Sequence, residues 1–97
     1  MLRLRSKYRS EMGIMGDILA VTMNEGQNGV AVLALSRKAN LSHFTAIDKC
    51  EKLINAGLIE TRRDDRTHRF MMTEKGLKFF DEFKHFQNLL ESMGLSV

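Results

Sequence analysis

The stretch that decides the fold of this chain spans residues 40–60 and reads NLSHFTAIDKCEKLINAGLIE. Asn40 can adopt the left-handed backbone conformation of a tight turn, and the hydroxyl of Ser42 can cap a helix that starts there. Gly57 stands where helices commonly end in a left-handed residue. The segment therefore predicts a turn followed by a helix from Ser42 to Ala56. Its apolar stripe consists of Ala46, Ile47, Cys50, Leu53 and Ile54.

Two more helices are predicted on the N-terminal side of this segment. Apolar residues recur with helical spacing from about Ser10 to Met23, which predicts the first helix. Residues 24–29 read NEGQNG, a composition typical of a loop. The run from Val30 to Ala39 is apolar enough for a second helix, and one or two extended residues could precede it.

The sequence on the C-terminal side has the pattern of a β-hairpin. Two runs of β-prone residues, Leu58–Arg63 and Thr67–Thr73, flank a polar tip of Asp64-Asp65-Arg66. Alternation along these runs separates an inward face from an outward one. The side chains expected to face inward are Leu58, Phe70 and Met72.

A last helix is predicted from Glu74 to about Met93, capped by Thr73 and closed by Gly94. The predicted order is helix, helix, turn, helix, hairpin, helix. This order indicates an α+β fold of the winged helix-turn-helix type, with a three-helix core, a two-stranded wing and a C-terminal helix.

Length and composition fit one small globular domain. The chain has 97 residues, of which 43% are hydrophobic and 28% charged. No apolar run approaches the roughly 20 residues that a membrane span needs. With a single cysteine, no disulfide framework can form within the chain, which favours a reducing compartment. We therefore expect a cytoplasmic protein.

Positive charge is concentrated in two places, although the net charge is only +3. An acid-free basic run at the N-terminus comprises Arg3, Arg5, Lys7 and Arg9. The second cluster surrounds the predicted hairpin tip and comprises Arg62, Arg63, Arg66 and Arg69. Because the arginine guanidinium can donate two parallel hydrogen bonds to a phosphate, the second cluster suits contacts to a nucleic-acid backbone.

Fold and charge together predict a surface that binds double-stranded DNA. In a winged helix-turn-helix, the second helix of the pair enters the major groove and the hairpin reaches flanking backbone. Asp48 would repel phosphate but could accept a hydrogen bond from cytosine N4. Phe44 lies at the border of the apolar stripe, and we expect it to pack against the core. The helix residues expected to face DNA are Ser42, His43, Thr45, Asp48, Lys49 and Lys52.

The sequence offers no catalytic or metal-binding constellation. Cys50 lies on the core face of its helix, where a small buried thiol is expected. His43 is seven residues away from it, and His68 and His85 belong to other elements, so zinc-ligand spacing is missing. There are no paired carboxylates, nucleophile motifs or phosphate-binding glycine loops. We expect no metal, no cofactor and no enzyme activity.

The last helix carries an apolar seam of its own. Its residues follow one another by four, three, four and three positions, which is the spacing of coiled-coil core positions. They are Phe79, Phe83, Phe86, Leu90 and Met93. Phe80 and Leu77, on the neighbouring flank, are expected to pack on the first helix. We therefore expect residues 1–73 to form a DNA-binding domain with a basic N-terminal arm, and residues 74–97 to form a homodimerisation helix.

Several motifs resemble a known family. They are Arg5-Ser6-Lys7-Tyr8-Arg9-Ser10, Lys38-Ala39-Asn40-Leu41-Ser42, Leu53-Ile54-Asn55-Ala56-Gly57-Leu58-Ile59-Glu60 and Thr73-Glu74-Lys75-Gly76-Leu77. In this order, over roughly residues 5 to 90, they resemble the archaeal winged-helix DNA-binding proteins of about ten kilodaltons. The resemblance implies a C-terminal helix that pairs as an antiparallel coiled coil. It also implies nucleoid-associated, chromatin-type or regulatory DNA binding.

Two other classes of function remain open from the sequence. A winged helix can serve as a protein-interaction module in a transcription or replication assembly, and Asp48 and the modest net charge favour this alternative. The wing arginines favour DNA. An RNA-binding module is disfavoured, because the aromatic-interleaved basic strands of single-strand readers are missing.

Overall fold

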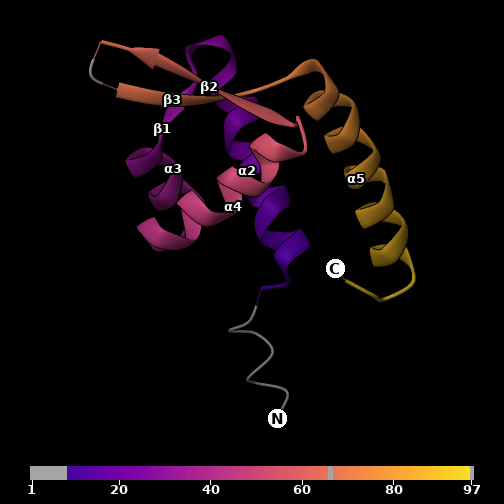
Figure 1. Ribbon diagram of the computed structural model, residues 1–97. Coiled ribbons are helices and arrows are strands. Elements are labelled where there is room, and N and C mark those ends of the chain that lie inside the picture. The colour runs from indigo at the N-terminus through magenta and orange to yellow at the C-terminus, as the bar shows by residue number, and fades with distance from the viewer. Residues whose placement is uncertain (1–8, 66, 97) are drawn as a thin grey trace.

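The computed structural model describes residues 9–65 and 67–96 (Figure 1). The predicted contact residue Arg66 and three residues of the basic N-terminal run, Arg3, Arg5 and Lys7, lie outside the described residues. The elements appear in the predicted order. They are α2 (Glu11–Glu25), the short 3-10 helix η1 (Gly26–Asn28), β1 (Val30–Ala31), α3 (Val32–Lys38), α4 (His43–Asn55), β2 (Ile59–Asp64), β3 (Thr67–Met72) and α5 (Glu74–Ser92).

Local side-chain chemistry fixes where three of these helices begin. Ser10, Ser42 and Thr73 each accept a hydrogen bond from a backbone N–H three residues further on, at 2.9, 3.1 and 2.9 Å. Each hydroxyl thereby satisfies a backbone donor that the helix itself leaves unpaired. The left-handed positions expected at Asn40 and Gly57 are also present, with φ of 56° and 80°. The turn before α4 and the end of α4 therefore follow the prediction.

The sheet has one strand more than the predicted wing. Its order is β1-β3-β2, and all neighbours are antiparallel. The extended residues ahead of α3 pair with the central strand, Val30 with Phe70 and Ala31 with Arg69. Because Asp64 pairs with Thr67, the hairpin closes through two residues instead of the predicted three. The β2–β3 hairpin projects beyond β1, and we call this hairpin the wing (Figure 1).

The core lies where α2, α3 and α4 meet the sheet. The residues buried there include Ile18, Leu19, Leu35, Leu53 and Ile59. Leu58 and Phe70 face inward as predicted, whereas Met72 is only partly buried. These contacts join the α3–turn–α4 unit and the wing in one folded body. The packed core therefore fixes the position of the wing relative to α4.

The first half of α5 packs on the same core. Phe80 is buried there as expected, but Leu77 is about half exposed. Phe83 was predicted on the dimer seam, yet it is only 6% exposed. Its ring fills the space beside Gly16 of α2, where a Cβ atom would overlap it. Phe83 therefore has little surface left for a second subunit, because the small residue on α2 lets the two helices approach closely.

None of the helices in the described ranges is long and apolar enough to cross a membrane.

Candidate nucleic-acid interface

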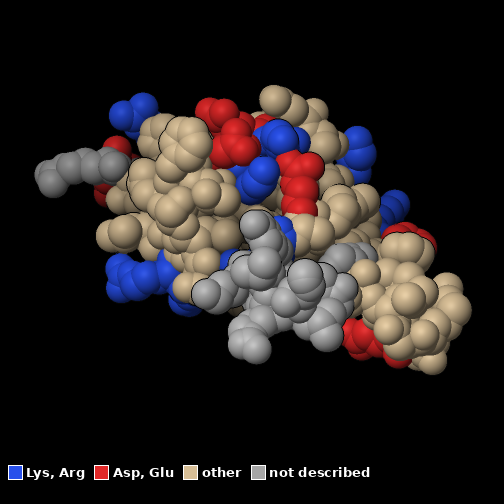
Figure 2. Space-filling view, turned by 90° about the horizontal axis from the view of Figure 1, so that it is seen from below, with Lys and Arg blue, Asp and Glu red and all other residues tan. Residues whose placement is uncertain are grey.

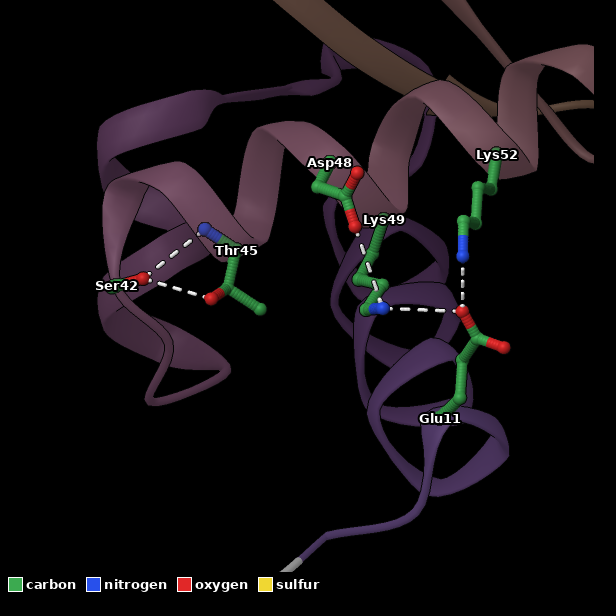
Figure 3. Close-up of polar contacts among 6 residues, drawn as sticks. All are labelled: Glu11, Ser42, Thr45, Asp48, Lys49 and Lys52. Carbon is green, nitrogen blue, oxygen red and sulfur yellow. Dashed lines mark hydrogen bonds and ion pairs between the residues drawn. The ribbon is translucent and has the colours of Figure 1, made fainter.

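The outer side of α4 is polar and begins at a capped, accessible end. Ser42 and His43 are exposed and Thr45 is partly exposed. The Ser42 hydroxyl accepts from the Thr45 backbone N–H at 3.1 Å and donates to the Thr45 hydroxyl at 2.9 Å (Figure 3). The opposite side of α4 is buried through Ala46, Cys50 and Leu53. This geometry presents the first turn of α4 to solvent in a fixed orientation.

Phe44 of α4 does not lie where its position in the sequence predicts. We expected it to pack on the core, but its side chain is 79% exposed. Two neighbours explain the difference. Ala46 and Cys50 fill the interface of α4 with the core and are buried to 1% exposure or less. Phe44 lies outside that stripe and therefore projects into water.

The second half of α4 is engaged within the chain. Glu11, the first residue of α2, lies between two lysines of α4 (Figure 3). Its Oε2 is 2.6 Å from Lys52 Nζ and 3.1 Å from Lys49 Nζ. Lys49 also lies 3.4 Å from the Asp48 carboxylate, and its side chain is only 17% exposed. We call Glu11, Asp48, Lys49 and Lys52 the α2–α4 ion-pair network.

The pKa values of the network reflect these contacts. Hydrogen bonds from Lys52 and then from Lys49 lower the pKa of Glu11 below its ordinary value. The hydrogen bond to Glu11 raises the pKa of Lys49 above its ordinary value, although desolvation opposes this rise. Both groups are therefore charged at neutral pH, and each helps to neutralise the other. The six predicted α4 contacts thus divide into an accessible set, Ser42, His43 and Thr45, and an engaged set, Asp48, Lys49 and Lys52.

The described wing arginines do not form one cluster. Successive residues of a strand point to opposite faces, so Arg62 and Arg63 lie on different faces of the wing. Cross-strand pairing places Arg62 opposite Arg69 and Arg63 opposite His68. The guanidinium of Arg69 additionally contacts the carbonyl oxygen of Gly29 at 3.5 Å. Two like charges directly opposite each other are unfavourable unless an anion lies between them. Arg62 and Arg69 therefore bring two positive charges together on one face of the wing.

The wing and the first turn of α4 lie on the same side of the molecule. Both are at the left of Figure 1, whereas α5 is at the right. Seen from below, basic and acidic side chains are interleaved near the centre of the surface and do not form one continuous basic area (Figure 2). Contacts of a nucleic-acid backbone with the face seen in Figure 2 would therefore depend on particular side chains and less on a broad positive field.

Arg9 ties the end of the N-terminal arm to the helix-turn-helix unit. It forms an ion pair with Asp17 of α2 and donates a hydrogen bond to the carbonyl oxygen of Asn40 at 2.9 Å. Asn40 is the left-handed residue of the turn before α4. Arg9 therefore lies next to the turn that precedes the predicted DNA-reading helix.

A metal or nucleophilic site does not emerge from the described part of the chain. Among residues 9–65 and 67–96, no three side chains of His, Cys, Asp or Glu gather closely enough to hold a metal ion. Cys50 is 1% exposed, and its burial raises the pKa of the thiol to about 12. A thiol in this state is protonated and inaccessible at neutral pH.

The second half of α5 carries an exposed apolar surface. Phe86 is 52% exposed, and its exposed apolar neighbours in sequence are Leu89, Met93 and Leu95. Phe79, closer to the core, stacks on the buried Phe83 with ring centroids 6.4 Å apart. The predicted seam is thus divided, because Phe83 is buried within the chain while Phe79, Phe86 and Met93 are exposed. Leu90 is partly buried. Leu89 was missed because it falls outside the four–three spacing.

Comparison with known proteins identifies the family to which this fold belongs. A family model described as winged helix-turn-helix matches residues 8–91. The chain belongs to the winged helix-turn-helix family. A search of the curated proteins gave no match.

Solved structures of this family's fold are similar to the chain at low sequence identity. BldR, a transcriptional regulator from Sulfolobus solfataricus, superposes with a TM-score of 0.73 at 23% identity, over 82% of this chain and 58% of BldR. MepR, a transcription regulator of the Staphylococcus aureus multidrug efflux pump MepA, gives 0.74 at 18% identity, over 82% and 60%. A MepR mutant bound to an oligodeoxyribonucleotide gives 0.71 at 18% identity, over 82% and 60%. The chain spans about three-fifths of the length of these regulators.

Proposed function

We propose that this winged helix-turn-helix protein binds double-stranded DNA as a homodimer and acts as a transcription regulator or a chromatin-type protein. One observation carries the proposal. The accessible first turn of α4 and the arginine-bearing wing lie on the same side of the molecule. A helix for the major groove beside a phosphate-binding hairpin is the docking geometry of this fold on a duplex.

The roles of the contact residues follow from their environments. Ser42, His43 and Thr45 are accessible to base edges or phosphates at the start of α4. Arg62 and Arg69 would hold one backbone strand, and Arg63 would contact phosphate from the other face of the wing. Arg66 is expected to contribute at the tip. Asp48, Lys49 and Lys52 would take part only when the α2–α4 ion-pair network opens.

Two further observations support the proposal. The MepR mutant named above was solved bound to an oligodeoxyribonucleotide, and it shares the fold of this chain. The motifs that resemble small archaeal winged-helix DNA-binding proteins span both the α4 segment and the start of α5. The homodimer is proposed to form through the exposed apolar surface of α5, because large apolar patches on soluble proteins commonly mark interfaces.

A binding titration tests the proposal. The protein is titrated with random and genomic duplexes at two salt concentrations, because the slope of log affinity against log salt counts the phosphates neutralised. An Arg62→Ala, Arg63→Ala and Arg66→Ala triple variant is expected to weaken binding to every duplex alike and to lower the slope by roughly two to three. Unchanged affinity and slope in the triple variant would contradict the role given to the wing.

The two faces of the wing can be separated in the same assay. The Arg62→Ala, Arg69→Ala variant removes one face, whereas Arg63→Ala, His68→Ala removes the other. The first variant is expected to lose more affinity, because the Arg62–Arg69 pair brings two permanent charges together and the other face has one. Equal losses would assign both faces to the duplex.

A protein-interaction module is the second candidate function. The α2–α4 ion-pair network favours it, because Glu11 and Asp48 offset the charge of the α4 lysines that a DNA-binding helix would use. Absence of duplex binding at low salt by the folded dimer would support this candidate over the first.

A further inference from the structure

Phe44 is a large apolar side chain in a polar, accessible place. It is 79% exposed in the first turn of α4, next to the Ser42 cap. The core gains nothing from a phenylalanine at this position, since the residues that anchor α4 are Ala46, Cys50 and Leu53. The position is therefore free to serve contacts outside the chain.

The neighbours of Phe44 indicate what kind of contact it can make. Ile47, three residues further on, is apolar and partly exposed, so the apolar area around Phe44 is small but includes more than one side chain. The other side chains of the exposed side of α4 are polar or charged. They are Ser42, His43, Thr45, Asp48, Glu51 and Lys52. The core of a protein–protein interface is predominantly apolar. A small apolar area among hydrogen-bonding groups matches the major groove better, where thymine presents a C5-methyl beside polar base edges.

The position of α4 in the fold agrees with a DNA duplex as the ligand. The first turn of α4 lies on the same side of the molecule as the wing. A duplex bound by the wing would bring its major groove toward the start of α4. The accessible turn contains the two hydroxyls of Ser42 and Thr45, which can hydrogen-bond to base edges or phosphates, and Phe44 between them.

We propose that Phe44 is a specificity-determining residue that contacts the C5-methyl group of a thymine in the major groove. The inference rests on the proposed DNA binding of this chain and adds the base chemistry that α4 prefers. Burial of one methyl group between the ring and the base gives a preference for thymine over uracil, which differs from thymine only by that methyl group.

Replacing thymine by uracil provides the test. The wild-type protein first selects a tight duplex from a random library, and each thymine of that duplex is then replaced by deoxyuridine, one at a time. Removing the contacted methyl is expected to weaken wild-type binding about three- to fivefold at one thymine in each half-site. The Phe44→Ala variant is expected to bind the thymine and uracil duplexes equally at that position.

Leu33→Ala is the matched control, because Leu33 is also an exposed apolar residue but lies on α3. This variant should keep the wild-type preference for thymine.

If wild type binds all uracil duplexes as tightly as the parent duplex, the inference about Phe44 is overturned while DNA binding stands. If the preference persists in Phe44→Ala, another residue contacts the methyl and the inference is again overturned. If no duplex is selected at all, both this inference and the proposed function are overturned.

Discussion

Gly76 lies in the first turn of α5, where the helix crosses the end of the wing. A Cβ atom at this position would overlap the carbonyl oxygen of Leu58 and approach the Met72 side chain to 2.9 Å. A backbone carbonyl cannot turn away as the tip of a side chain can. We therefore expect Gly76→Ala to lower the free energy of unfolding by about 1–3 kcal/mol, the usual cost of overpacking. Urea unfolding followed by circular dichroism measures this loss.

Gly16 and Gly13 of α2 provide a graded comparison. At Gly16 a Cβ atom would overlap the ring of Phe83, whereas at Gly13 its nearest neighbour would be Ser10 Oγ at 3.1 Å. Alanine favours a helix over glycine by about 1 kcal/mol, which partly offsets any steric cost. The expected order of destabilisation is Gly76→Ala, then Gly16→Ala, then Gly13→Ala. A Gly76→Ala protein as stable as wild type would contradict the close contact between α5 and Leu58.

Cys50 should be inert in the folded protein. The side chain is 1% exposed, and burial raises the pKa of the thiol to about 12. Since the thiolate is the reactive form, a disulfide reagent at pH 8 should modify native protein only as fast as the core opens. In denaturant the same reagent should modify one thiol per chain at once. Rapid modification of native protein would show that Cys50 is not enclosed by the core.

At the scale of elements, the ion-pair network joins the start of α2 to the second half of α4. Glu11 is the group that Lys49 and Lys52 share, at 3.1 and 2.6 Å. The Glu11→Gln variant should release both lysines for phosphate. We expect it to bind random duplexes more tightly than wild type and to steepen the dependence of log affinity on log salt by roughly one to two. Filter binding or fluorescence anisotropy at several salt concentrations measures both quantities.

Glu25→Gln is the matched control for this prediction. Glu25 pairs with Lys38 at 2.5 Å, so the variant removes the same charge and also frees a lysine, but not one of α4. Its effect on duplex affinity should be smaller than that of Glu11→Gln. Equal effects of the two variants would mean that net charge alone matters and that the network does not restrain α4.

The network also has a defined pH dependence. The pKa of Glu11 is lowered in the folded protein, so the ion pairs stabilise the fold above the ordinary carboxyl pKa of 4.5. This contribution is lost as the pH falls through the lower folded value. The stability difference between wild type and Glu11→Gln should therefore be present at neutral pH and vanish in acid. Parallel urea titrations at several pH values would detect this convergence.

The elements of this fold could be predicted where local chemistry decides them. The caps at Ser42 and Thr73 act on N–H groups three residues away, and Asn40 and Gly57 adopt their left-handed conformations within the turns that contain them. The third strand was harder to foresee. Two residues ahead of α3 become a strand only because the edge of β3 is available to them, and β3 lies about forty residues further along the chain.

The candidate site was less predictable, because it depends on contacts between distant elements. Helical spacing placed Lys49 and Lys52 on the outer side of α4, but Glu11 lies 38 and 41 residues before them. The spacing of apolar residues also predicted an apolar seam on α5. It did not indicate which element would cover that seam. Gly16 leaves room for one ring, and Phe83 fills it. Phe44 was misassigned for the same reason, since the core reaches only as far as Ala46.

At the scale of the whole molecule, α5 has two apolar surfaces, one buried against its own chain and one exposed to water. Phe80 and Phe83 bind it to the body of the same chain, so the start of the helix is fixed relative to α4 and the wing. The surface around Phe86 remains in water in the single chain. A second copy that covers this surface would hold two α4 helices at a set separation. Two linked DNA-reading units bind with an avidity that one unit lacks.

Phe86→Ala tests whether α5 makes this dimer. Phe86 is 52% exposed in the single chain, so its truncation should leave the fold and the thermal stability of the monomer nearly unchanged. In a dimer the ring would be buried twice by symmetry, and truncating a buried phenylalanine costs about 3–5 kcal/mol per copy. We expect the variant to be mostly monomeric at concentrations where wild type is dimeric, and to bind duplex DNA far more weakly. Sedimentation equilibrium measures the shift. Phe44→Ala, which removes an even more exposed aromatic group on α4, should remain dimeric. A monomeric wild type at micromolar concentration, or a Phe86→Ala protein that stays fully dimeric, would refute an α5 interface centred on Phe86.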